Sequence, residues 1–310
     1  MQKIIIICGP TAVGKTQIAI DLAKKFNGEI VSADSGQVWK GFDIGTAKEN
    51  HQSRNNLLDE PPCSVTQHLI DILDPTEHID ASKFVALADA AIKDISSRGK
   101  NIFVVGGTGM YLKMLVHGFC EAPPRDLEIR KKLEDEARLL GISKLHERLQ
   151  TIDGESAKVL HANDTTRIIR ALEIFELTGV SATEFRRKHG FAEKRYDALK
   201  IGLTCDREKL YRRINERVDK MIEMGLIEEG KNLLKKYDES CQPFSAVGYR
   251  ETVNFIKGKM GLEDTIRLIK QNTRHFAKRQ LTWFRADKEI KWFEPDQLRP
   301  LCHCLRSWEI

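Results

Sequence analysis

The amino-terminal third of the chain alternates short apolar runs with longer amphipathic segments. Three runs, at 4–8, 29–32 and 102–105, have the length and apolar content of buried strands. Two segments, at 16–25 and 80–97, repeat their apolar residues at helical spacing. Because strands and helices alternate, the pattern predicts an α/β fold, a parallel sheet with helices on both faces.

The pattern changes after residue 119. The next stretch is helical throughout, with helices expected at 127–140, 143–150 and 164–177. A strand pattern returns at 199–203, and further helices are expected at 206–224, 226–237, 247–256 and 262–285. We therefore predict a core formed by residues 1–119 and 198–310, which a helical insertion at 120–197 divides.

Composition limits the class of protein. With 41% hydrophobic and 31% charged residues among 310, the chain is typical of a folded globular protein. The longest apolar run, at 4–8, is far shorter than the ~20 residues of a membrane helix, and no signal-peptide cleavage site precedes or follows it. We expect a cytoplasmic monomer that does not associate with membranes.

The cysteines do not suggest cross-links or a metal. There are seven, an odd number, and five of them are scattered singly, which predicts reduced thiols. Only Cys302, His303 and Cys304 are clustered, and this tripeptide lacks the second pair of ligands of a structural zinc site. We interpret it as part of a carboxyl-terminal helix or tail.

Positive charge is concentrated in the last segment. The net charge is +5, and basic minus acidic residues give −1 for 1–119, 0 for 120–197 and +6 for 198–310. Residues 267–285 include no acidic residue. As a helix, they would place Arg267, Lys270, Arg274, Lys278 and Arg285 on one face and bury Leu268, Ile269, Phe276 and Trp283 on the other. A face that serves only solubility mixes charge signs, so this basic stripe predicts contact with a phosphate backbone.

One motif carries a specific chemistry. Residues 9–16 satisfy the phosphate-loop pattern G-x-x-x-x-G-K-[ST] between a predicted strand and a predicted helix. Such a loop directs backbone N–H groups at phosphate oxygens, and the helix amino terminus adds positive charge. Its members are Gly9, Pro10, Thr11, Ala12, Val13, Gly14, Lys15 and Thr16. Lys15 is expected on terminal phosphate oxygens and Thr16 on magnesium.

The remaining sequence narrows the use of this loop. No Asn-Lys-x-Asp base reader of a GTPase occurs, and the strand at 102–105 runs into two glycines instead of a Walker B Asp. A transferase that presents a bound diphosphate to a second substrate remains. Asp34 and Thr108 follow strands at the ligand-binding edge of the sheet, as a candidate base and a candidate contact. An Asx turn and a helix cap are the structural alternatives.

Two arginine pairs share a helix face and could grip a diphosphate. Arg213 and Arg217 are four residues apart, and Arg167 and Arg170 are three apart. A solvated helix face is the alternative for both pairs.

Taken together, six stretches resemble the tRNA dimethylallyltransferase family, also called tRNA isopentenylpyrophosphate transferase. They are GPTAVGKT from Gly9, SADSGQVWKGFDIGTAK from Ser32, VGGTGMYLKML from Val105, NDTTRIIRALEIFELTG from Asn163, AVGYRE from Ala246 and FAKRQLTWFR from Phe276. The resemblance implies a P-loop NTPase-like core and transfer of a dimethylallyl group from dimethylallyl diphosphate to N6 of the adenosine 3′-adjacent to the anticodon. The lack of a carboxyl-terminal zinc finger matches the bacterial type.

The resemblance also implies roles for individual residues. Residues 9–16, Arg213 and Arg217 would hold the diphosphate with Mg²⁺ at Thr16, and Asp34 would be the general base. Lys15, Thr16 and Arg213 would complete the catalytic group. The residues implied to contact the anticodon stem-loop are Asp34, Ser35, Gly36, Gln37, Thr108, Arg130, Thr166, Arg167, Ile168, Ile169, Arg170, Ala246, Val247, Gly248, Tyr249, Arg250, Lys278, Arg279, Gln280, Leu281, Thr282, Trp283, Phe284 and Arg285.

Three alternatives share parts of this interpretation. A P-loop nucleotide kinase has the loop and the sheet but no evident use for the basic stripe. An isopentenyltransferase acting on free adenine nucleotides has the same chemistry, and the segment 276–285 argues for tRNA instead. An RNA-binding module with a vestigial loop would not need Lys15, Thr16 and Asp34.

Overall fold

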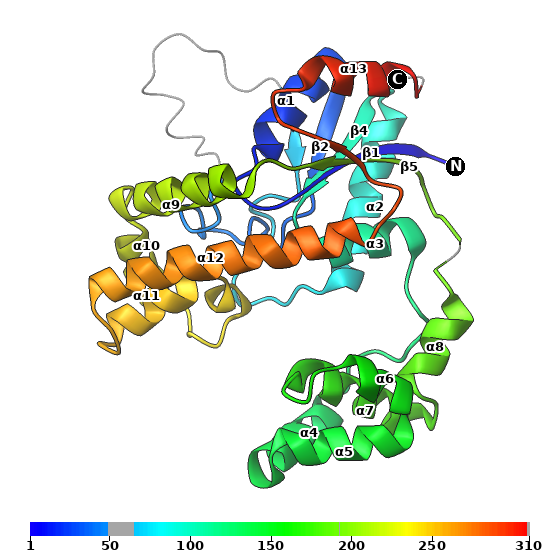
Figure 1. The fold of residues 1–310 in the computed structure, drawn as a ribbon, viewed down its shortest axis with the longest axis vertical. Coiled ribbons are helices and arrows are strands. Elements are labelled where there is room, and N and C mark those ends of the chain that lie inside the picture. The colour runs from blue at the N-terminus through cyan, green and yellow to red at the C-terminus, as the bar shows by residue number, and fades with distance from the viewer. Residues whose placement is uncertain (49–64, 192, 309–310) are drawn as a thin grey trace. The chain divides into compact units, whose positions relative to one another are not determined.

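The computed structural model describes residues 1–48, 65–191 and 193–308. The chain forms two compact units, Met1–Val116 with Tyr196–Ile310, and His117–Arg195 (Figure 1). We call them the core unit and the insertion unit. The insertion unit begins three residues before and ends two residues before the insertion predicted at 120–197. One of the seven cysteines, Cys63, lies outside the described residues.

Within the described residues, the core unit is built on a six-stranded sheet in which all neighbouring strands are parallel. The strand order is β3 (Gln67–His68), β2 (Gly28–Ser32), β4 (Asn101–Gly106), β1 (Lys3–Cys8), β5 (Asp197–Leu203) and β6 (Lys291–Phe293). The four predicted strands are confirmed. Strands β3 and β6 were not predicted, because edge strands of two and three residues carry too little apolar pattern.

The carboxyl ends of the central strands meet at one edge of the sheet. Cys8 at the end of β1 lies beside Gly106 at the end of β4, and Ser32 at the end of β2 lies beside Val105. The loops that follow β1, β2 and β4 therefore leave the sheet next to one another. These loops carry the phosphate-loop motif and Asp34, so the sheet gathers the candidate site residues at this edge.

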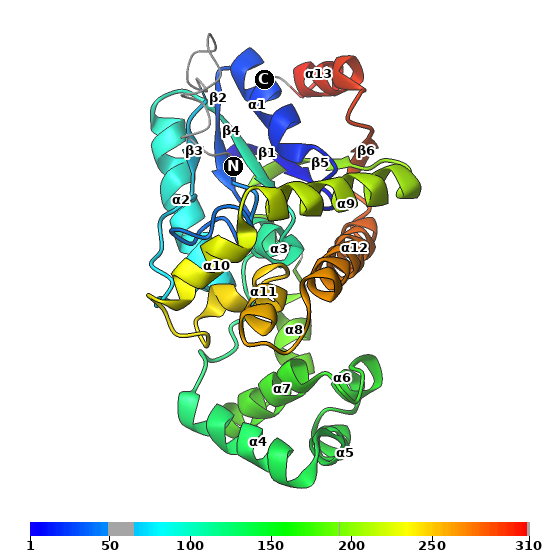
Figure 2. The same ribbon diagram turned by 90° about the vertical axis from the view of Figure 1, so that its left-hand side faces the viewer.

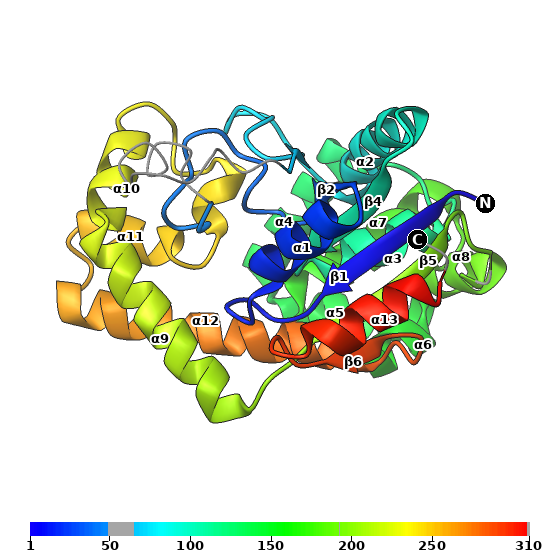
Figure 3. The same cartoon turned by 90° about the horizontal axis from the view of Figure 1, so that it is seen from above.

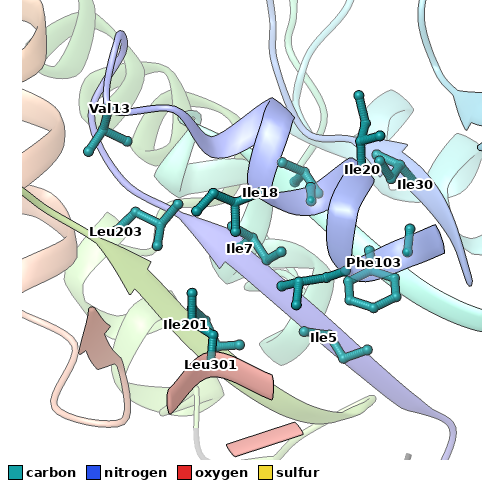
Figure 4. Close-up of a cluster of buried hydrophobic side chains, with 14 of the residues drawn as sticks. Ile5, Ile7, Val13, Ile18, Ile20, Ile30, Phe103, Ile201, Leu203 and Leu301 are labelled. Atoms are coloured by element: carbon teal, nitrogen blue, oxygen red, sulfur yellow. The ribbon is translucent and has the colours of Figure 1, made fainter. Parts of the chain in front are cut away.

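Helices cover both faces of the sheet, as predicted. Figure 4 shows strand residues such as Ile7 and Ile201 packed with Ile18 of α1 (Lys15–Lys25) and Leu301 of α13 (Leu298–Arg306). The neighbouring strand residue Ile6 is also buried, and α2 (Ala81–Ser97) packs on β2 and β4. Each fully buried aliphatic side chain contributes ~1.5–3 kcal/mol, so this double burial stabilises the frame that holds the site.

The remaining helices of the core unit follow β4 and β5. They are α3 (Gly109–His117), α9 (Arg207–Glu223), α10 (Leu226–Leu234), the 3₁₀ helix η2 (Gln242–Ser245), α11 (Tyr249–Ile256) and α12 (Leu262–Arg285). Helix α12 packs against α9 and α11, as Figures 2 and 3 show. The helix predicted from 247 starts two residues later, because Gly248 has a φ of +100°, outside the helical region.

The bounds predicted for α12 are confirmed, but its predicted buried face is partly wrong. Phe276 and Trp283 are 36% and 45% exposed, whereas Ala277, Gln280 and Phe284 are buried. Periodicity gives the direction of an apolar face only approximately. The neighbours of the helix, among them the loops after β1 and β4, select the line of residues that is buried.

The insertion unit consists of α4 (Leu127–Leu140), α5 (Ile142–Ile152), α6 (Gly154–Val159), α7 (Thr165–Thr178) and α8 (Ala182–His189). Its buried centre includes Leu133, Leu145, Leu149 and Leu172. The three predicted helices are confirmed, whereas α6 and α8, with six and eight residues, are too short to show a clear period. The unit thus has a hydrophobic core of its own.

The structure shows the state of five cysteines and allows a search for metal-binding groups and membrane-spanning helices. Cys8, Cys205, Cys241, Cys302 and Cys304 are free thiols. Cys302 is buried in α13 and, with Cys304, packs against the core of the sheet. The described residues hold no group of three or more His, Cys, Asp or Glu that could bind a metal ion. No helix in the described ranges has the length and apolar character needed to cross a bilayer.

Candidate active site

The phosphate loop connects β1 to α1. Gly9 and Gly14 have φ values of +143° and +102°, and a Cβ at Gly9 would lie 2.5 Å from the carbonyl oxygen of Leu203, so glycine is required there. Gly14 caps α1, and Lys15 and Thr16 are in its first turn. The partial positive charge of a helix amino terminus favours an anion at this position.

Two arginines of α9 reach this loop. Arg213 donates from Nη1 to the Val13 carbonyl oxygen at 3.4 Å, and Arg217 donates from Nη1 to the Thr11 hydroxyl at 3.3 Å. These partners are about 200 residues apart in sequence. The structure therefore excludes a purely solvated face for this pair and brings two guanidinium groups to the phosphate loop.

A small polar cavity of about 60 Å³ lies beside the loop. It is lined by residues of the phosphate loop, of the segment after β2 and of α9, which include Thr11, Lys15, Thr16, Asp34, Gln37, Thr46 and Arg217. The candidate base predicted from sequence thus lines the same cavity as Lys15, Thr16 and Arg217.

Asp34 forms the Asx turn and also lies at the ligand-binding edge, the two arrangements that the sequence left open. Its Oδ1 accepts a hydrogen bond from the Gly36 N–H at 2.8 Å, which is an Asx turn. The same carboxylate lines the cavity. The next residue, Ser35, donates its backbone N–H to the Thr108 hydroxyl at 3.2 Å, so the segments after β2 and β4 are tied together. The turn holds the carboxylate in place and does not exclude a role as a base.

The charged groups of the cavity influence one another. Withdrawal from water lowers the pKa of Lys15 to about 8, while the nearby Asp34 carboxylate favours the charged lysine. Burial also lowers the pKa of Arg217, and Asp34 again acts in the opposite direction. The Lys15 ammonium donates a hydrogen bond to the Pro10 carbonyl oxygen at 2.8 Å. The cavity therefore concentrates positive charge that an anion would stabilise.

The loop after β2 is held by a carboxylate that the sequence motifs did not predict. Glu229 of α10 accepts hydrogen bonds from the backbone N–H groups of Asp43, Ile44 and Gly45, with shortest distances of 3.2, 2.9 and 3.4 Å. It also accepts the Tyr249 hydroxyl at 2.6 Å. A Glu on a helix carries no local signal of this role, since the backbone groups that it binds are more than 180 residues away.

Tyr249 was expected to contact tRNA, but its side chain is buried, which corrects that expectation. Its side chain is 1% exposed, and a Cβ on Gly45 would lie 2.5 Å from its ring. The hydroxyl accepts the Gly45 N–H at 3.1 Å. The ring fills the space that the glycine leaves, so this tyrosine supports the loop from inside the protein.

Other residues of the expected tRNA surface differ in accessibility. In α12, Lys278, Arg279, Thr282, Trp283 and Arg285 are exposed, Leu281 is half-buried, and Gln280 and Phe284 are buried. Elsewhere in the core unit, Ser35 and Arg250 are exposed, Gly36, Gln37, Thr108, Ala246 and Val247 are partly exposed, and Gly248 is buried. The side chains of Gln280 and Phe284 point into the protein and do not form part of an outer surface, which corrects their expected role.

The basic stripe of α12 is accessible mainly in its second half. Lys270 pairs with Asp219 of α9 at 2.6 Å, and Arg274 donates to the Asn215 side chain at 2.7 Å. These interactions join α12 to α9. The exposed Lys278 and Arg285, nearer the carboxyl end, present positive charge to solvent.

In the insertion unit, a buried carboxylate organises the expected contacts. Glu173 is fully buried and pairs with Arg170 at 2.9 Å and with Arg130 at 3.4 Å. The side chains of Ile168 and Ile169 are buried in the core of this unit, so they cannot contact tRNA as expected. Thr166 and Arg167 are exposed, and Arg167 pairs with Asp164. Within 166–170, the polar residues thus flank two adjacent isoleucines that form the helix interface.

The fold and this cavity define a class of protein. A phosphate loop that two arginines contact, and a carboxylate that shares a cavity with the loop and Arg217 at the edge of a parallel sheet, define a P-loop α/β protein suited to group transfer from a bound diphosphate.

Comparison with known proteins identifies the family. The profile of the IPP transferase family matches residues 37–287. A tRNA dimethylallyltransferase 2 of Geotalea uraniireducens is 47% identical over 97% of this chain and 95% of its own length. A tRNA dimethylallyltransferase of Geobacter metallireducens is 46% identical over 94% and 92%. The chain belongs to the IPP transferase family, the tRNA dimethylallyltransferases.

Solved structures agree with this assignment. The full-length tRNA isopentenylpyrophosphate transferase from Bacillus halodurans has a TM-score of 0.72 and 39% identity, covering 99% of this chain and 96% of that one. A eukaryotic dimethylallyltransferase acting on tRNA has a TM-score of 0.74 and 32% identity, covering 91% and 70%. The α/β fold and the family predicted from sequence are confirmed.

Proposed function

We propose that this member of the family transfers the dimethylallyl group of dimethylallyl diphosphate to N6 of the adenosine 3′-adjacent to the anticodon of tRNA. The family supports the reaction, and one observation supports the residue roles. Asp34 lines the same cavity as Lys15, Thr16 and Arg217. A proton acceptor and the groups that bind a leaving diphosphate are therefore neighbours.

The phosphate loop and α9 stabilise the leaving group. In the reaction, the bond between the allylic carbon and the diphosphate oxygen breaks, and the oxygen keeps the electron pair. Negative charge grows on that oxygen, and we assign its binding to the Lys15 ammonium, Arg217 and the loop N–H groups, with Arg213 next to them at the Val13 carbonyl. The electrostatic parts are those of phosphoryl transfer, although the bond broken is carbon to oxygen.

Asp34 accepts the proton. As N6 of the adenine forms its bond to the allylic carbon, it must lose a proton, and we assign this proton to the Asp34 carboxylate, which lines the cavity. Its turn with Gly36 and the link between Ser35 and Thr108 hold it in position. The adenine must leave its stack to reach this cavity, which costs a few kcal/mol.

The residues present fit a magnesium ion. The Thr16 side chain lines the cavity in the first turn of α1, and a hydroxyl oxygen there is a suitable ligand for Mg²⁺ bound to a diphosphate. When bound, the ion would neutralise part of the diphosphate charge.

We infer that tRNA binds through exposed basic residues in both units. In the core unit these are Lys278, Arg279 and Arg285 on α12, and in the insertion unit Arg167 is exposed. Their partners would be phosphates of the anticodon stem-loop. We further propose, as expected from the sequence, that the protein acts in the cytoplasm as a monomer.

The experiment combines labelled dimethylallyl diphosphate with unmodified tRNA or with AMP. We expect label in tRNA and none in AMP with the wild-type protein. Asp34→Asn keeps the oxygen that accepts the Gly36 N–H and removes the base, so turnover should fall about 10²–10⁴-fold while tRNA binding stays unchanged. Asp296→Asn, at an exposed position, is the matched control and should be fully active.

Two results would contradict the proposal. Label in AMP would show a free-nucleotide transferase, and an active Asp34→Asn variant would remove Asp34 from the mechanism. Incubation with ATP and nucleosides tests the kinase alternative, and a phosphorylated product there would replace prenyl transfer as the function.

A further inference from the structure

Gln280 is a buried polar side chain on a helix whose neighbouring residues Lys278, Arg279 and Thr282 face solvent. Its Oε1 accepts the backbone N–H of Thr11 at 2.8 Å, and its Nε2 donates to the carbonyl oxygen of Gly107 at 3.0 Å. A backbone N–H only donates and a carbonyl only accepts, so these two partners fix the orientation of the amide. Gln280 thus bridges the phosphate loop and the loop after β4.

The fit around this amide is close. A Cβ on Gly107 would lie 2.2 Å from Nε2 of Gln280, while the next nearest atom outside Gln280, the Gly9 carbonyl oxygen, is 3.6 Å away. Gly107 therefore leaves room for the glutamine side chain. A larger residue at 107 would displace the amide before it met anything else.

The bridge also fixes which groups the backbone and side chain of Thr11 contact. Its N–H is directed at Gln280, while its hydroxyl contacts Arg217. Loss of the glutamine amide would leave this N–H and the Gly107 carbonyl without their buried partner, and an unmade buried hydrogen bond is costly. The loop would shift to regain partners, and with it the contact that holds Arg217.

We propose that Gln280 is a positioning residue that holds the phosphate loop in its donor-binding shape. The inference rests on the proposed function, because it takes the loop as the diphosphate site. It assigns Gln280 to donor binding, although the flanking residues of the same helix face solvent and belong to the proposed tRNA surface.

The first test replaces the amide by an apolar chain of similar length, Gln280→Met. We expect about tenfold weaker binding of inorganic diphosphate with Mg²⁺ and a similar rise in the KM for dimethylallyl diphosphate. The affinity for tRNA and the Tm should remain close to wild type. Gln271→Met, at an exposed position on the same helix, is the matched control and should leave diphosphate binding unchanged.

The second test uses the contact with Gly107. Gly107→Ala should displace the amide and weaken diphosphate binding about as much as Gln280→Ala does. The double variant should be no weaker than Gln280→Ala alone, because the clash disappears with the side chain. Additive losses would mean that Gly107 acts independently of Gln280.

Two outcomes overturn the proposal. One is diphosphate affinity in Gln280→Met equal to wild type. The other is a loss of diphosphate affinity that accompanies equal losses of tRNA affinity and of Tm, which is the sign of general destabilisation. Failure of the wild-type protein to bind diphosphate or to prenylate tRNA would instead refute the proposed function.

Discussion

The Lys15 ammonium favours binding of a diphosphate but lowers the stability of the ligand-free protein. Its ordinary pKa is 10.5, and the cavity lowers it to about 8. At pH 7 the ammonium is charged in both the folded and the unfolded chain, so its removal from water reduces stability. A diphosphate would reverse this cost, because a trianionic or dianionic ligand supplies the missing partner. The site is thus arranged for an occupied state.

We therefore expect Lys15→Met to stabilise the ligand-free protein and to abolish diphosphate binding. Between pH 8 and 10.5 the folded wild type has lost a proton that the unfolded chain keeps, so its free energy of unfolding rises with pH. The variant should lack this rise and be more stable at pH 7 by about 1–3 kcal/mol. Denaturant unfolding at pH 7 and pH 10 measures both effects.

The control is Lys24→Met, on the exposed side of the same helix. It should leave the pH dependence unchanged. A Lys15→Met variant less stable than wild type at pH 7 would contradict this account of the cavity.

At the scale of elements, two helices that follow β5 hold loops that follow β1 and β2. Helix α9 places Arg213 and Arg217 on the phosphate loop, and α10 places Glu229 on the loop that includes Gly45. Loops of this kind are mobile unless their backbone groups have partners. The cavity therefore depends on helices from the distant, carboxyl-terminal part of the core unit.

Glu229→Gln tests the hold on the loop. The substitution keeps one acceptor oxygen but turns an NH₂ group toward backbone N–H donors that Glu229 accepts from. We expect the free energy of unfolding to fall by about 1–3 kcal/mol and the KM for dimethylallyl diphosphate to rise. Chemical denaturation and steady-state kinetics measure these effects.

Glu228→Gln is the matched control, since Glu228 pairs only with Lys231 on the surface of the same helix among the ion pairs described. It should change stability by less than ~0.5 kcal/mol. Equal effects of the two substitutions would argue against the hold on the loop.

At the scale of the whole molecule, charge separates into sites with different tasks. The positive excess of the last segment divides between Arg213 and Arg217 at the cavity, Lys270 and Arg274 in contact with α9, and the exposed residues near the end of α12. Of these three groups, the last is exposed to solvent and can meet a long polyanion. Net charge alone does not distinguish these tasks.

We expect tRNA affinity to fall with salt, with a log–log slope of roughly −0.7 to −0.9 per phosphate contacted. The double variant Lys278→Ala with Arg285→Ala should weaken tRNA binding and reduce the slope by about 1–2. Arg299→Ala, exposed on α13, is the control and should leave both unchanged. Binding titrations at 50–300 mM salt measure the slope; an affinity independent of salt would remove the basic stripe from tRNA recognition.

Much of this protein was determined by the sequence itself. The four longer strands, the phosphate loop and α12 follow from patterns within a few residues, because strand and helix periods and a glycine-rich turn are local properties. The family follows from several long motifs in order. The edge strands β3 and β6 were missed, since pairing with a neighbour decides whether two or three residues become a strand.

Only the tertiary structure decided which side chains meet. Tyr249 and Gln280 are buried, although they belong to motifs expected to contact tRNA. Glu229 binds the loop after β2 and the Tyr249 hydroxyl. The tertiary structure also brought Arg217 to Thr11, a pair that the sequence separates by 206 residues. Such contacts depend on how the sheet and its helices pack, and no local pattern records a partner that lies elsewhere in the chain.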